Sequence, residues 1–145
     1  NKEKLFLTAG LDVLQELIEH QKTNITPATN GLDAVRLFAK AYFDFAQDPK
    51  SDFMILVRCS PFSDLKTIED KEIMIRNFSG LYEILTSCIV RGIEDGSIRQ
   101  VDPNRISVVV FCNLVGGVRH HLLTPYGTPD LLDDVVSFIV HSLRA

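Results

Sequence analysis

The chain has 145 residues, of which 46% are hydrophobic and 23% are charged, and its formal net charge is -4 at pH 7. This length suits one domain with a buried core. Because Lys and Arg form no run anywhere, the composition argues against direct binding of this stretch to nucleic acid or to an anionic membrane.

Pro and Gly divide the chain into segments whose apolar spacing predicts helices. The first helix is expected from about Lys2 to Lys22, with Asn1 as a candidate cap and with one apolar stripe. The second is expected to follow an Asn30 cap and to run to about Asp48. Its charged residues form one narrow line, so it should be central and packed on most sides.

A third, shorter helix is predicted to start at Asp48-Pro49 and to stop at Pro61. The polar stretch SDLKTIEDKE should contain a loop. A long fourth helix is expected from about Lys71 to Glu94, ending at Gly96 as a left-handed C-cap that Ile98 folds back to cover.

Asp102-Pro103 and Thr128-Pro129 predict the starts of a fifth and a sixth helix. No segment shows convincing period-two alternation. We therefore predict an all-α fold, a single domain of about six helices spanning residues 1–145.

The fifth segment is unusual because the stretch ISVVVFCNLVGGV is apolar on every side of a helix, apart from Ser107 and Asn113. This run is expected to be too short to cross a bilayer. Together with the broad apolar face of the last helix, it predicts a self-complementary patch that forms an intermolecular four-helix bundle in a homodimer. The alternative is a core helix in a monomer. The predicted interface residues are Val109, Gly116, Gly117, Leu132, Val135, Val136, Ile139 and Leu143.

Catalytic and metal-binding patterns are not apparent. His120 and His121 are adjacent, so on a helix they point about 100° apart and cannot share one metal ion without distortion. No zinc, phosphate-loop or nucleophile motif occurs, and we expect no enzyme activity and no cofactor. The three cysteines, Cys59, Cys88 and Cys112, have apolar neighbours and no C-x-x-C spacing, which is typical of reduced thiols in a cytoplasmic protein.

Aromatic side chains are spread over the second, third and fourth predicted helices. Most of them are explained by an ordinary core. Together with a few polar groups, they also fit a cavity for an apolar or aromatic ligand with one polar end near Arg58.

Two segments resemble TetR-type transcriptional regulators. NKEKLFLTAG at residues 1–10 is similar to the junction that links the recognition helix to the regulatory domain. IVRGIEDGSIRQVDP at residues 89–103 is similar to the end of a long helix and the start of the first dimerisation helix, and LVGG at 114–117 falls where small residues are common.

The resemblance implies that the chain is the effector-binding and dimerisation domain of a regulator, usually a repressor. It implies a cytoplasmic homodimer that contacts duplex DNA only through a helix-turn-helix segment upstream of residue 1. A small effector between the middle helices would shift the DNA-binding heads through the first helix. By helix position, the residues expected to contact the effector are Tyr42, Phe45, Met54, Arg58, Phe78, Tyr82 and Asn113.

Two other functions stay open at this point. A small helical enzyme would need a polar cluster with shifted pKa values inside the core. A helical adaptor would have a solid core and would bind a protein through an exposed apolar surface.

Overall fold

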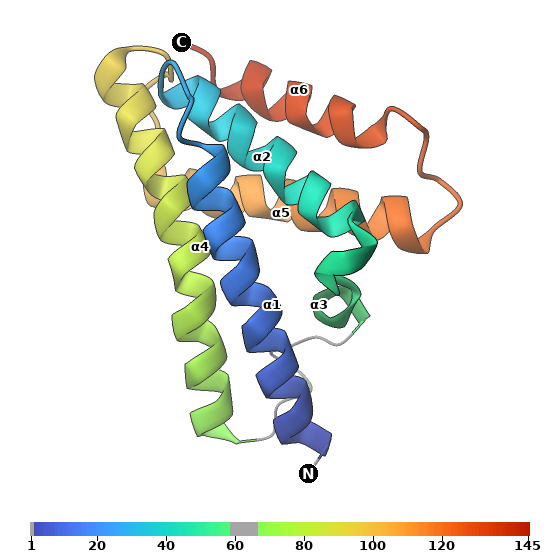
Figure 1. Cartoon of the computed structure of the whole chain (residues 1–145). Coiled ribbons are helices and arrows are strands. Elements are labelled where there is room, and N and C mark those ends of the chain that lie inside the picture. The colour runs from blue at the N-terminus through green and yellow to red at the C-terminus, as the bar shows by residue number, and fades with distance from the viewer. Residues whose placement is uncertain (1, 59–66) are drawn as a thin grey trace.

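The computed structural model describes residues 2–58 and 67–145, and these ranges form an all-α bundle as expected. The helices are α1 (Lys2–Asn24), α2 (Gly31–Gln47), α3 (Met54–Arg58), α4 (Ile68–Asp95), α5 (Pro103–Leu123) and α6 (Leu131–Leu143), with a short 3-10 helix, η1 (Pro49–Ser51). Figure 1 shows α1 and α4 side by side, both rising from the end that holds the N-terminus, while α2, α5 and α6 are stacked across the other end.

Helix α2 is the centre of the bundle. It packs against α1, α4, α5 and α6, and Val35, Phe38 and Ala39 have no exposed surface. The prediction of a central second helix, made from its narrow line of charged residues, is confirmed.

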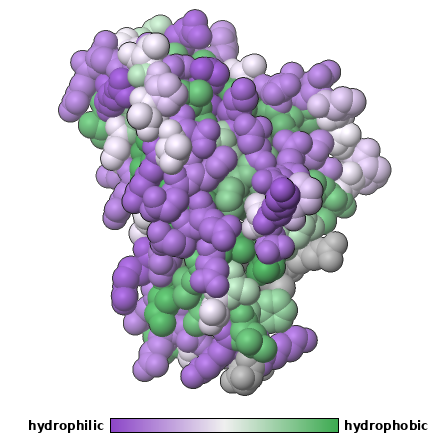
Figure 2. Space-filling model, in the orientation of Figure 1, coloured by the Kyte–Doolittle hydropathy of each residue, from purple (hydrophilic) through white to green (hydrophobic). Residues whose placement is uncertain are grey.

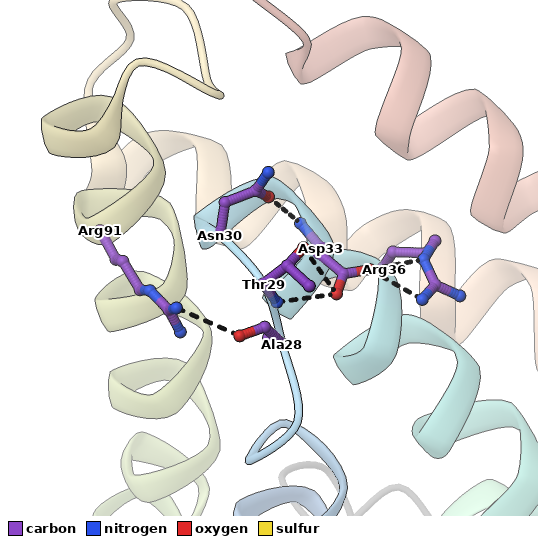
Figure 3. Close-up of polar contacts among 6 residues, drawn as sticks. All are labelled: Ala28, Thr29, Asn30, Asp33, Arg36 and Arg91. Atoms are coloured by element: carbon purple, nitrogen blue, oxygen red, sulfur yellow. Dashed lines mark hydrogen bonds and ion pairs between the residues drawn. The ribbon is translucent and has the colours of Figure 1, made fainter.

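The start of α2 is held by a capping network (Figure 3). Asn30 Oδ1 accepts a hydrogen bond from the Asp33 N–H at 2.8 Å, as its N-cap position predicts, and Thr29 N–H donates to Asp33 Oδ2 at 3.0 Å. Arg36 donates to Asp33 Oδ1 at 2.7 Å. The Thr29 N–H, and after it Arg36, hold the pKa of Asp33 below its usual value.

Two glycines allow α2 and α4 to approach closely. A Cβ added to Gly31 would fall on the backbone nitrogen and Cα of Gly92, so only glycine fits at the first position of α2. At this crossing Gly31 N–H donates to Asp95 Oδ2 at 2.7 Å, and Leu32 N–H donates to Ser97 Oγ at 3.1 Å. The end of α4 therefore supplies acceptors for the free amides at the start of α2.

The end of α4 follows the predicted geometry. Gly96 ends the helix with φ 83°, in the left-handed region. Ile98 N–H then donates to the Gly92 carbonyl at 2.9 Å, and its side chain is 2% exposed. Residues 97–99 also meet the C-terminal residues through backbone hydrogen bonds, and Ile98 and Arg144 form an isolated bridge.

Three predicted helix boundaries were wrong. The third helix is divided, because Asp52 adopts φ 56° between η1 and α3; its expected stop at Pro61 lies outside the described residues, as does the expected Asn1 cap. Helix α4 begins at Ile68, before the expected start near Lys71, because Thr67 caps it through the Asp70 N–H. Helix α6 begins at Leu131 rather than at Pro129, which lies in the preceding turn.

Helix α5 is longer than its most apolar run. The helix has 21 residues, and by length and composition alone it could cross a membrane. The expectation that this segment is too short for a bilayer considered only the most apolar run and was therefore wrong for the whole helix. In the structure, however, α5 packs against α2, α4 and α6 as one helix of the bundle. A core helix passes the same test of length and composition, and 33% of the apolar window of α5 is buried within the bundle.

Candidate functional site

An aromatic cluster joins α2, α4 and α5 around Phe111. The Phe111 ring centroid lies 4.3 Å from that of Tyr82, 5.7 Å from Phe38 and 6.2 Å from Tyr42. Phe53, just before α3, meets the Tyr42 ring edge-on at 5.5 Å. Contacts of this geometry stabilise beyond the area they bury, so four segments of the chain are tied together at this point.

The structure brings some of the predicted effector-contact residues together. Tyr42 and Tyr82 both belong to the cluster, and Phe45 borders it through Phe53 at 6.0 Å. Met54 and Phe78 are half-buried against the same core.

The other two predicted residues lie differently. Asn113 is half-buried on α5, and its side-chain amide donates to the Val109 carbonyl of its own helix at 2.9 Å. Two residues from Phe111 along a helix correspond to about 200°, so the structure does not bring Asn113 to the cluster. For Arg58 only the backbone is described, at the end of α3, and the prediction for its side chain falls outside the described part of the chain.

Both cluster tyrosines are neutral over the physiological pH range. Burial, and after it the neighbouring Tyr82, raises the pKa of Tyr42 far above its usual value. Burial also raises the pKa of Tyr82, with a further contribution from Cys112. A neutral phenol keeps its O–H, so each residue can donate a hydrogen bond to a ligand but cannot supply a phenolate for catalysis.

The sequence argument missed the importance of Phe111. Phe111 was not singled out because its helix is apolar all round, so its spacing does not reveal which residues face the core. Nor did the sequence argument single out Phe53, which joins the start of α3 to Tyr42. A Phe in the middle of the most apolar helix was the available indication.

The described residues were also searched for metal ligands and reactive thiols. They contain no group of three His, Cys, Asp or Glu side chains that could hold a metal ion. Burial raises the pKa of Cys88 to about 11, which keeps this thiol protonated and unreactive at neutral pH. Cys112 is exposed on α5, whereas Cys59 lies outside the described residues.

An exposed apolar face runs along α5 and α6, on the sides turned away from the core. Its members have exposed fractions between 37% and 64%, and we call them the outer face: Val108, Val109, Val115, Leu122 and Phe138. Gly116 lies among them, and a Cβ added there would meet nothing within 4 Å. Scattered exposed apolar residues are ordinary, but several on two packed helices mark a candidate interaction surface.

The predicted interface residues divide between the two sides of these helices. Val109 and Gly116 lie on the outer side, and Val135 and Val136 are half-buried. The remaining four pack inside the chain's own core: Gly117, Leu132, Ile139 and Leu143. At Gly117 an added Cβ would lie 3.3 Å from Phe43 Cζ, so this glycine serves the packing of α5 on α2 within one chain.

A second apolar area lies at the end of the bundle where α1 and α4 begin. Figure 2 shows hydrophobic atoms gathered at this lower end, on a face that is otherwise mostly hydrophilic. Its exposed apolar residues are Leu5, Phe6, Ile68 and Ile75.

Comparison with known proteins identifies the fold. No protein-family model and no curated protein sequence matches the chain. Among solved structures, a TetR family transcriptional regulator, PfmR from Thermus thermophilus, superimposes with a TM-score of 0.78 at 20% sequence identity. The match covers 99% of this chain and 75% of that chain. The resemblance predicted from the two sequence segments is therefore confirmed at the level of the fold.

Proposed function

We propose that residues 1–145 are the effector-binding and dimerisation domain of a TetR-like transcriptional regulator that acts as a repressor in the cytoplasm. The observation that carries this proposal is the helix arrangement shared with a regulator of that family over 99% of the chain. In this proposal a helix-turn-helix segment precedes residue 1 and makes all contacts with duplex DNA. The net charge of -4 supports a domain that does not itself bind DNA.

The outer face supports homodimerisation. In the proposed dimer, α5 and α6 of two copies form an intermolecular four-helix bundle around a two-fold axis, which covers Val109, Val115 and Phe138. Gly116 leaves an open position there, at which two backbones can approach. Val109, Val115 and Phe138 are exposed in the single chain, so their burial contributes to association rather than to folding.

The aromatic cluster supports an apolar or aromatic effector. Ligand sites are mostly apolar with a few polar groups, and the Tyr42 and Tyr82 phenols supply such groups beside Phe111. We place the effector between α2, α4 and α5 next to these rings, with Met54, Phe45 and Phe78 at the edges. Its polar end would lie near Arg58.

Contacts from the cluster to α1 provide a route for the response. Phe38 meets Phe111 at 5.7 Å, and its carbonyl accepts a hydrogen bond from Gln21 Nε2 of α1 at 3.0 Å. Helices α1 and α4 are also closely packed, because a Cβ on Gly80 would lie 3.3 Å from Ile18 Cδ1. An effector that separates the rings would therefore displace α1, which joins the proposed DNA-binding segment.

The N-terminal end of α1 carries the exposed apolar residues Leu5 and Phe6. Helix α4 begins at the same end of the bundle with the exposed Ile68 (Figure 1). In the proposal, these side chains pack against the upstream segment. Movement of α1 then changes the separation of the two DNA-binding heads of the dimer.

The test compares this chain with the longer chain that the proposal implies, in which a helix-turn-helix segment precedes residue 1. The longer protein should bind a palindromic duplex in a gel shift, and residues 1–145 alone should not, even at low salt. Native mass spectrometry of both should show dimers and any small molecule that co-purifies. That molecule should weaken DNA binding, and by linkage DNA should weaken its binding by the same factor. A longer chain indifferent to DNA would refute the regulator assignment.

A further inference from the structure

An open surface groove of about 520 Å³ lies between α4 and α5, and Tyr82, whose ring also packs in the aromatic cluster, forms part of its largely apolar lining. Residues at helical spacing on α4 and on the first turns of α5 line it: Ser79, Tyr82, Glu83, Thr86, Ser87, Asn104, Ser107 and Val108.

The aromatic wall of the groove is held in place. The Tyr82 ring packs against Phe111 with centroids 4.3 Å apart and stays half-buried. Because Phe111 is 4% exposed and fixed in the core, a ligand in the groove meets a ring whose orientation is already set. An aromatic surface attracts cations through its quadrupole.

The groove carries negative charge. Glu83 is the charged residue among the described lining residues, and no Lys, Arg or His is found there. Among the described residues no Lys or Arg forms an ion pair with Glu83, so its carboxylate is not neutralised by a protein cation. The groove therefore favours a cation over an anion.

The hydroxyl groups offer acceptors. Ser79 Oγ donates its hydrogen to the Ile75 carbonyl at 2.8 Å, and Ser107 Oγ donates to the Asn104 carbonyl at 2.9 Å. With its hydrogen engaged, the exposed Ser79 oxygen presents lone pairs to a ligand, whereas Ser107 is 2% exposed and lies at the floor of the groove. A ligand that carries N–H donors is the complementary partner.

We propose that this groove binds an organic ammonium ion, with the ammonium group between the Glu83 carboxylate and the Tyr82 ring and its N–H groups directed at the Ser79 oxygen. The inference does not depend on the regulator assignment, because it concerns a cationic ligand at Tyr82 and Glu83 of α4 rather than the apolar cluster or the outer face, with which the groove shares Val108.

The test is a two-dimensional NMR titration of residues 1–145 with three probes of one shape. These are 3-methylbutylammonium, the neutral 3-methylbutan-1-ol and the anionic 3-methylbutanoate. The ammonium ion should shift the amide signals of Ser79, Glu83 and Ser107 at millimolar concentrations, and its affinity should fall with added salt. The alcohol should bind roughly three- to fivefold more weakly, and the carboxylate more weakly still.

Matched variants locate the effect. Glu83→Gln should reduce ammonium affinity to that of the alcohol, and Ser79→Lys should abolish it by placing a cation one turn from Glu83. Glu72→Gln changes an exposed Glu about three turns earlier on the same side of α4 and should have no effect. Because Glu83 is exposed, its variant should keep the helical circular dichroism of the parent. Equal affinity for alcohol and ammonium, an unaffected Glu83→Gln variant, or no shifts at the lining residues would each overturn the proposal.

Discussion

Phe138 lies on the outer side of α6, where 64% of the residue is exposed, while the adjacent Ile139 is 2% exposed in the core. Replacing Phe138 with Ala should therefore leave the folding of one chain almost unchanged, within about 0.5 kcal/mol. If the outer face is the dimer interface, the same substitution should weaken association strongly.

The magnitude follows from the exposed area. A Phe side chain buries roughly 200 Å², so an exposed fraction of 64% leaves about 130 Å² to be covered by a partner. At about 25 cal/mol per Å² this area is worth about 3 kcal/mol in each copy. If half of it is lost on truncation to Ala, a symmetric dimer loses about 3 kcal/mol in total, which is roughly a hundredfold in the dissociation constant.

Sedimentation velocity over a concentration series measures this constant directly. Ile68→Ala is the control, because Ile68 is 75% exposed but lies at the opposite end of the bundle, at the start of α4. A Phe138→Ala protein that dimerises as tightly as the parent would refute this interface. Gly117→Glu is a poor test, since Gly117 packs on Phe43 inside the chain and the variant should misfold.

Three further predictions concern packing and thiol chemistry. Gly31→Ala should lower the free energy of unfolding by about 3 kcal/mol or more, since its methyl group meets the α4 backbone. Gly116→Ala has open space at its position and should raise the free energy of unfolding of the separated chain by up to about 1 kcal/mol. Urea unfolding followed by circular dichroism measures both, and similar values for the two variants would contradict the packing. In the dissociated chain, where the outer face is open, an alkylating reagent followed by peptide mapping should modify Cys112 rapidly and Cys88 only on unfolding. Rapid labelling of Cys88 would contradict its burial. Because the folded pKa of Cys88 is raised to about 11, its unfolded thiol ionises first, so stability should fall as the pH rises from about 9 to 11. Cys88→Ala should lack this part of the pH dependence.

The sequence by itself determined the class of fold and most helix ends. Caps are local, and a side chain such as Asn30 or a backbone such as Gly96 meets groups only a few residues away, so short-range patterns were sufficient. The resemblance at residues 1–10 and 89–103 also depended on local turns and caps, and the comparison with a solved structure bears out the fold that it implied.

Only the tertiary structure decided how α5 is turned about its axis. Since this helix is apolar on every side, its spacing carries no information on which residues face the core. Packing on α2, α4 and α6 places Phe111 and Gly117 inside and Val108 and Val115 outside. The position of Asn113 follows from the same rotation. Likewise, α3 follows the left-handed Asp52 and packs against α1, a contact between residues far apart in the chain that no local pattern encodes.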